Sequence, residues 1–189
     1  MKNRIFIIII IFIGFSSNLF AQQSCEVESS KIINAQIIDK NDIICIAKNS
    51  DKPYTIFYTF ASWCAPCRLH FPDAFELQKS EKIDLFVVLV EAEKDPRVNN
   101  AINFIKSYSE NIKFGILKDS FYGTKTKRRN SKFATEITPK HNELIEDYGK
   151  FILIDKNGNI LYVTNWKDYN KDWKNSKKML ESKILPLIK

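Results

Sequence analysis

The chain has 189 residues, of which 44% are hydrophobic and 27% charged, with a formal net charge of +7. This length can bury a substantial core, and the hydrophobic content excludes a chain that is disordered throughout. Lys and Arg are scattered apart from the run Lys125–Arg129, which has no aromatic-rich binding motif beside it. A solvated loop explains that run better than a nucleic-acid site, so no nucleic-acid partner is expected.

The first 21 residues have the pattern of a signal peptide. Lys2 and Arg4 precede an apolar run over residues 5–15, which is shorter than the roughly 20 residues of a membrane-spanning helix. Leu19-Phe20-Ala21 fits a cleavage site after Ala21, and cleavage removes two of the seven net positive charges, leaving +5. We therefore divide the chain into a signal peptide, an N-terminal arm and one domain, at residues 1–21, 22–30 and 31–189.

The signal pattern places the mature protein in the periplasm or another extracytoplasmic space. The alternatives are an uncleaved membrane anchor and a lipid on Cys25, although Gln22-Gln23-Ser24 makes a poor lipobox. All four cysteines follow the signal, and disulfides persist in oxidising compartments. A disulfide between Cys25 and Cys45 would tie the arm to a hairpin expected over residues 31–48, with free or lipidated thiols as the alternatives.

The first elements expected are a hairpin, a strand and a helix. Residues 31–48 resemble a hairpin, because apolar residues alternate before a turn at Asn41-Asp42 and a second apolar run follows. Residues 54–60 have the β-branched and aromatic composition of a buried strand. A helix should follow, since Pro66 suits a first helical position and Pro72 should kink it two turns later.

Strands and helices should alternate further along the chain. Residues 83–90 predict a second buried strand, and Asp95-Pro96 should start a helix that continues to Tyr108. Residues 114–117 predict a third strand. We interpret the polar residues 118–138 as a loop insertion and residues 140–147 as a short helix.

The last elements predicted are a hairpin and a helix. Residues 151–155 and 160–163 flank Asn157-Gly158, a strong tight-turn signal. The tail places Trp173, Leu180, Ile184 and Leu187 on one helical face. The order strand–helix–strand–helix–strand followed by a hairpin indicates an α/β fold: a mixed central β-sheet flanked by helices on both faces, with an N-terminal β-hairpin extension.

Cys64 and Cys67 form a CxxC motif where a strand gives way to a helix. The helix N-terminus favours a thiolate on Cys64, which should attack disulfides, while Cys67 should resolve the mixed disulfide. A metal site is the alternative, but the chain has one CxxC, two histidines (His70 and His141) and no second paired set. A CxxC beside a βαβ pattern therefore favours redox chemistry, with no metal and no other cofactor.

The segment from Thr59 to Pro72, TFASWCAPCRLHFP, resembles the active site of TlpA/ResA-like thioredoxin-family proteins, which are exported or membrane-tethered thiol–disulfide oxidoreductases. The hairpin from Phe151 to Ile160 resembles that family's late strand pair. The resemblance implies a thioredoxin-like fold and dithiol–disulfide exchange with protein partners. Trp63 could be a core residue or a flat lid beside Cys64, and the resemblance implies the lid. An external thiol relay would reset the pair, and we expect a monomer.

The chain departs from the family pattern at two positions. The family usually has an acidic residue three positions after the second cysteine, where this chain has His70. His70 could take the proton of Cys67 or be a packing histidine. The family's cis-proline position falls at Gly149, preceded by Tyr148, and we expect a trans peptide there, since a non-proline cis bond costs about 3 kcal/mol. We expect the missing cis-proline to affect substrate range and potential more than the disulfide chemistry.

The function expected is an exported thiol–disulfide oxidoreductase. The alternative is a non-catalytic metal-binding or metal-delivery module that uses the same CxxC. The residues do not specify whether the protein acts as reductant, oxidant or isomerase, nor its partner.

Overall fold

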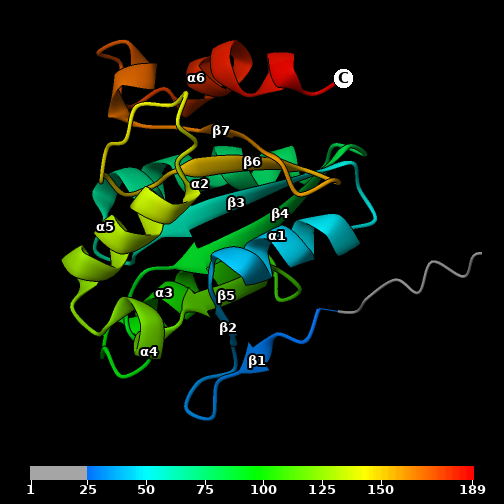
Figure 1. Cartoon of the computed structure of the whole chain (residues 1–189). Coiled ribbons are helices and arrows are strands. Elements are labelled where there is room, and N and C mark those ends of the chain that lie inside the picture. Colours follow the sequence, from blue (N-terminus) through cyan, green and yellow to red (C-terminus); the bar gives the residue numbers. More distant parts are fainter. Residues whose placement is uncertain (1–24) are drawn as a thin grey trace, which may run out of the picture.

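The computed structural model describes residues 25–189, so the predicted signal peptide lies outside the described residues. These residues form a seven-stranded mixed sheet in the order β1-β2-β5-β4-β3-β6-β7 (Figure 1). The strands are β1 (Glu28–Ser29), β2 (Gln36–Ile38), β3 (Tyr54–Phe60), β4 (Ile83–Leu89), β5 (Lys113–Leu117), β6 (Phe151–Asp155) and β7 (Ile160–Val163). Strands β2, β5, β4 and β3 run parallel, whereas β1, β6 and β7 pair antiparallel to their neighbours.

Helices cover both faces of this sheet; Figure 1 shows α1 in front of it and α2 behind. The helices are α1 (Lys40–Asn49), α2 (Ala65–Leu77), α3 (Val98–Lys106), α4 (Asp119–Tyr122), α5 (Thr126–Ile137), α6 (Ser176–Lys183) and the 3₁₀ turns η1 (Trp166–Tyr169) and η2 (Leu185–Leu187). The mixed sheet with helices on both faces confirms the predicted fold class.

The strands predicted around the CxxC motif are confirmed. Strand β3 lies between β4 and β6 and is buried from Thr55 to Phe60, as its β-branched and aromatic composition indicated. The hairpin of β6 and β7 turns at Gly158, which has a φ of 84°. The central strands therefore form a rigid base, and the CxxC motif follows directly from the end of β3.

The hairpin predicted over residues 31–48 is wrong in its second half. The antiparallel pair is formed earlier, by β1 and β2, and residues 40–49 form the helix α1 instead of a strand. Asp39 caps this helix by accepting hydrogen bonds from the amides of Asn41 and Asp42, while the Asp42 side chain accepts from the Asp39 amide. This capping box turns the supposed Asn41-Asp42 turn into the first turn of a helix.

The loop predicted over residues 118–138 is also wrong, because α4 and α5 occupy most of it. The supposed solvated run Lys125–Arg129 includes the start of α5, and the Arg129 side chain is fully buried. Its guanidinium donates to the carbonyls of Val90, Leu117 and Gly123 and to the carboxylate of Asp119. Arg129 therefore joins α5 to the ends of two central strands.

Three smaller expectations differ in detail. Residues 140–147 form turns and extended chain, not a helix. Helix α3 is confirmed but starts at Val98, with Arg97 as its N-cap residue, and not at Pro96. The terminal helix α6 begins at Ser176, so Trp173 precedes it. Helix α2 runs through Pro72, the position where the sequence predicts a kink.

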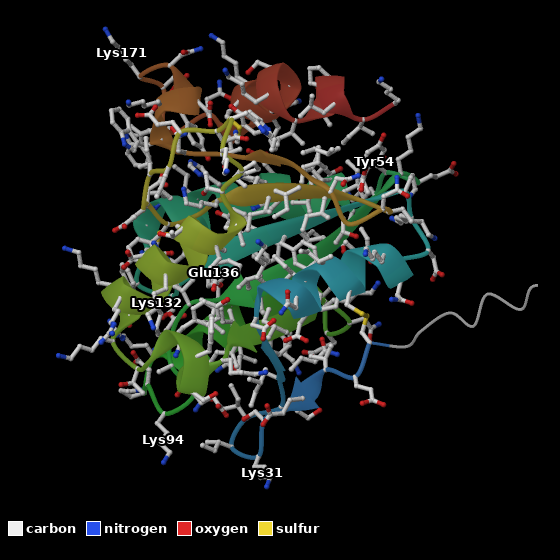
Figure 2. All side chains as sticks on the ribbon, viewed as in Figure 1. Lys31, Tyr54, Lys94, Lys132, Glu136 and Lys171 are labelled. Carbon is white, nitrogen blue, oxygen red and sulfur yellow. A yellow bond between two sulfur atoms is a disulfide. The ribbon has the colours of Figure 1, made fainter. Side chains whose placement is uncertain are left out.

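Charged side chains cover the outside of the molecule. Figure 2 shows Lys31, Lys94 and Lys171 pointing away from the body of the protein, in separate regions. Within residues 25–189, none of the helices combines the length and apolar character needed to cross a membrane.

Candidate active site

The CxxC motif lies at the start of α2, immediately after β3. The chain turns between Ala61 and Cys64, where the Cys64 amide donates to the Ala61 carbonyl over 3.1 Å. Cys64 is the N-cap residue of α2, and Pro66 is the second helical residue, one position later than predicted. Cys64 and Cys67 form a disulfide, and the Cys67 amide also donates to Cys64 Sγ at 3.2 Å. In the reduced protein this amide and the helix dipole would stabilise a thiolate on Cys64.

The two cysteines differ in exposure in the order that the sequence predicts. Cys64 retains 6% of its surface, whereas Cys67 is fully buried. The Cys67 carbonyl accepts a hydrogen bond of 2.9 Å from the Tyr58 hydroxyl in β3. Burial holds the pKa of Tyr58 well above its usual value, so this hydroxyl stays protonated and remains a donor. Tyr58 thus anchors the first turn of α2 to strand β3.

The loop before β6 packs against the cysteine pair, as the family resemblance implied for Tyr148 and Gly149. Gly149 has a φ of 74°, and a Cβ built on it would lie 3.4 Å from Cys67 Sγ. No peptide bond among residues 25–189 is cis, so the expected trans peptide at Gly149 is confirmed. Glycine suits this site because its backbone adopts positive φ without strain.

Trp63 lies beside Cys64 on the surface, with 39% of its area exposed. Its ring meets the Tyr148 ring edge-to-face at 4.8 Å between centroids. The Arg97 guanidinium lies 5.7 Å from the Trp63 ring centre. These contacts hold Trp63 between the loop before β6 and the loop before α3, a position suited to the predicted lid.

His70 is buried, with 3% of its surface exposed, and both ring nitrogens have partners. Nε2 lies 2.6 Å from the Trp173 carbonyl oxygen and must donate to it, which leaves Nδ1 to accept from the Tyr169 hydroxyl at 3.1 Å. The imidazole also stacks on the Tyr169 ring. Burial lowers the pKa of His70, which keeps the ring neutral. Of the two roles weighed for His70, these contacts favour packing.

Glu91 is a buried carboxyl that sequence reasoning missed. It follows β4 and is fully buried, and its Oε1 accepts from the Ser62 amide at 2.7 Å and from the Ser62 hydroxyl at 3.2 Å. Its Oε2 has no hydrogen-bond partner within residues 25–189. Burial raises the pKa of Glu91, although the bonds from Ser62 oppose the shift. Glu91 thereby supports the turn that leads into Trp63 and Cys64.

A cavity of about 610 Å³ opens beside the redox pair. Its lining includes Cys64, Trp63, Pro66, His70, Tyr148 and Gly149, so the predicted residues other than the buried Cys67 meet at one opening. The C-terminal segment completes the wall with Trp166, Tyr169 and Trp173. No sequence signal placed that segment here, because it reaches the site only through the fold.

Cys25 and Cys45 form a second disulfide, which is the first of the alternatives that the sequence left open. It joins the arm before β1 to the middle of α1. The Asn49 amide nitrogen lies 3.1 Å from Cys25 Sγ and also donates to the Cys45 carbonyl at 3.0 Å. This disulfide therefore fastens the N-terminal arm to the domain, away from the redox cavity.

No protein-family model matches the chain. Over 52 residues, or 28% of its length, the chain is 38% identical to the chloroplast thioredoxin Y1 of Arabidopsis thaliana, and the match covers 30% of that protein. The chain spans less than a third of the length of the curated relatives it matches.

Among solved structures, similarity extends over more of the chain at lower identity. A thiol:disulfide interchange protein from Bacteroides sp. is 13% identical with a TM-score of 0.45, covering 84% of this chain and 88% of that one. A thioredoxin-like protein from Aeropyrum pernix is 14% identical with a TM-score of 0.44, covering 72% and 81%. The chain is similar in sequence to thioredoxins over its matched stretch, which confirms the thioredoxin-like resemblance stated for its redox motif.

Proposed function

We propose that the protein is an exported thiol–disulfide oxidoreductase that exchanges the Cys64–Cys67 pair with cysteines of protein partners. One observation carries this proposal: the two cysteines form a disulfide at a helix N-terminus, with Cys64 lining an open cavity and Cys67 buried behind it. This arrangement suits an attacking and a resolving thiol.

In the reducing direction the Cys64 thiolate attacks one sulfur of a substrate disulfide. A bond forms between Cys64 and that sulfur, and the other substrate sulfur leaves as a thiolate. The Cys67 thiolate then attacks Cys64 Sγ, which forms the Cys64–Cys67 disulfide and releases the second substrate thiolate. Two electrons pass to the substrate, and the oxidising direction is the reverse sequence.

The surrounding residues serve this exchange in distinct ways. Pro66 lacks an amide hydrogen and suits the first turn, where such donors have no helical partner. Trp63 and Tyr148 bound the opening beside Cys64, and Gly149 lets the loop approach Cys67 Sγ. The cavity therefore gives a substrate access to Cys64.

Export is part of the proposal and rests on two features. The first is the charged start and apolar run at the N-terminus, which has the pattern of a signal peptide. The second is the Cys25–Cys45 disulfide, because structural disulfides are rare in proteins of reducing compartments. We further propose that an external thiol relay restores the redox pair after each turnover.

The deciding experiment traps the mixed disulfide. The Cys67→Ser variant should accumulate a covalent complex with its substrate protein through Cys64, whereas Cys64→Ser should be inactive in exchange. The double variant Cys25→Ser/Cys45→Ser serves as the matched control and should retain exchange. Trapping through Cys67 in the Cys64→Ser protein would reverse the assignment of the two thiols.

Whether the protein acts as a reductant or an oxidant can be determined by measuring the redox equilibrium of the Cys64–Cys67 pair with glutathione. A potential near that of thioredoxin, about −270 mV, indicates a reductant, and one near −120 mV indicates an oxidant. A tight copper or zinc complex in a protein without any exchange activity would instead support the metal-delivery alternative.

A further inference from the structure

All three tryptophans of the chain line the cavity beside Cys64. Trp63 precedes the redox pair, whereas Trp166 and Trp173 come from the segment after β7, more than a hundred residues later. Their exposed fractions are 39%, 60% and 46%. Exposed large aromatic side chains gathered at one opening mark an interaction site more often than scattered ones do. We call this opening the tryptophan pocket.

The wall that carries Trp166 and Trp173 is fastened to the redox elements. The Trp166 amide donates to the Asp147 carboxylate over 2.7 Å, and Asp147 also pairs with the buried Lys150, which follows Gly149. The Trp173 carbonyl accepts from His70 in α2. The tryptophan pocket is therefore preformed, with its outer wall tied to both the loop and the helix that hold the cysteines. Preformed sites lose less entropy when a ligand binds.

Most charges around the tryptophan pocket are already paired. Cations lie 5.7, 5.9 and 5.7 Å from the centres of the three indole rings, and they belong to Arg97, Lys167 and Lys174. Arg97 pairs with Asp95 and Lys167 with Glu143, each at 2.5 Å.

The acids of the lining have partners as well. Asp147 pairs with Lys150, and Glu146 accepts a hydrogen bond of 2.7 Å from the Ser131 hydroxyl. Within residues 25–189 Lys174 has no ion-pair partner, but elsewhere in the lining an incoming charged side chain would have to displace these partners. A neutral apolar side chain meets aromatic surface without that cost.

We propose that the tryptophan pocket selects polypeptide substrates that carry a neutral aromatic or large aliphatic residue next to the reacting cysteine. The inference rests on the proposed function, because Cys64 lies in the lining and the occupant must bring a sulfur to it. Trp166 and Trp173 are then specificity-determining residues. Partial burial of one aromatic side chain between them should favour such a substrate by about tenfold or more in kcat/KM.

Three probes test this inference. Two are synthetic hexapeptides with one cysteine in a mixed disulfide with thionitrobenzoate, one with Phe and one with Gly beside the cysteine. The third is glutathione in the same mixed disulfide, so that all three probes share one leaving group. Rate constants are measured with the reduced wild-type protein, with Trp166→Ala and Trp173→Ala, and with Phe121→Ala as the matched control. Phe121 is also an exposed aromatic residue, with 51% of its surface accessible, but it lies in α4 and not in this lining.

The wild type should prefer the Phe peptide to the Gly peptide by about tenfold or more. Each tryptophan variant should lose most of that preference, and Phe121→Ala should keep it. Equal rates for the two peptides with the wild type, or a faster reaction with the glutathione mixed disulfide than with the Phe peptide, would overturn the inference even if a variant failed to fold. Absence of reaction with all three probes would instead refute the proposed function itself.

Discussion

His70 Nε2 donates a hydrogen bond to the Trp173 carbonyl oxygen 2.6 Å away, and so joins the redox helix to the C-terminal segment. Its Nδ1 is occupied by the Tyr169 hydroxyl. A neutral imidazole with both nitrogens engaged has no lone pair free for the Cys67 proton. We therefore regard His70 as a positioning residue that holds the wall of the tryptophan pocket.

His70→Ala should lower the free energy of unfolding by about 2–3 kcal/mol, because it removes two hydrogen bonds and a buried stacked ring. The rate at which Cys67 resolves the mixed disulfide should fall by much less than the roughly tenfold or more expected from losing a general base. Urea titration measures the first quantity, and stopped-flow at pH 5.5–8.5 measures the second. His141→Ala, at the other and exposed histidine, is the matched control. Slower resolution that His70→Glu restores would establish the base role instead.

Glu91→Gln should change how stability depends on pH. The folded-state pKa of Glu91 is raised above its ordinary value of 4.5, so its contribution to stability is complete below that value and is lost as pH rises through the folded pKa. Glutamine does not titrate. The free energy of unfolding of the variant, relative to wild type, should therefore increase as pH rises from about 4.5 to 7.5.

Urea titrations across this range measure that difference. Glu181→Gln, at an exposed position in α6, should show no such trend. A Glu91→Gln difference that is constant with pH would show that burial does not raise the pKa of Glu91.

Gly149→Ala should cost about 1–2 kcal/mol of stability, since its φ of 74° is unfavourable for alanine. The methyl group would lie 3.4 Å from Cys67 Sγ and 3.5 Å from the Tyr58 hydroxyl, so it should also slow exchange. Gly123→Ala is the matched control, because Gly123 has a φ of 81° but no atom within 4 Å of the added Cβ. Both variants should lose stability, measured by urea titration, but only Gly149→Ala should slow exchange. Equal exchange rates would mean that a glycine is needed at position 149 only for its backbone conformation.

Removing the Cys25–Cys45 disulfide by Cys25→Ala/Cys45→Ala should lower the free energy of unfolding by about 3 kcal/mol. The Cys25–Cys45 disulfide joins residues separated by 20 positions in sequence, whereas Cys64 and Cys67 are separated by 3. Because loop entropy grows with length, Cys64→Ala/Cys67→Ala should lose less stability. Chemical denaturation of both proteins under non-reducing conditions compares the two losses. A larger loss from the shorter loop would contradict this account.

Elements with their own strong local signals were predictable from the sequence. Strand β3 could be recognised from its aromatic and β-branched composition, and the β6–β7 hairpin from its Asn157-Gly158 turn. Residues 43–47 were not predictable in this way, because a short apolar run suits a buried strand and a helix equally. The Asp39–Asp42 capping box decides for the helix. Helix α5 was missed because its polar residues include the buried Arg129, whose partners come from distant strands.

The redox pair and its immediate neighbours were predictable because they form one contiguous motif. Gly149 could be placed by counting back from a recognisable strand. Tyr58 and Glu91 could not, since a tyrosine within a strand and a glutamate after one carry no signature of their own. Trp166 and Trp173 reach the cavity only once the segment after β7 has folded against His70 in α2.

The Cys25 sulfur can make one covalent bond beyond its own side chain, and in this structure that bond is to Cys45. A lipid thioether on the same atom would exclude it and leave Cys45 as an odd thiol beside Asn49. Lipid attachment and arm closure are thus competing fates of a single atom during maturation. In an oxidising compartment, a chain lipidated at Cys25 would have a free Cys45 thiol that could form a wrong disulfide. A chain with the Cys25–Cys45 disulfide cannot carry a lipid anchor on Cys25.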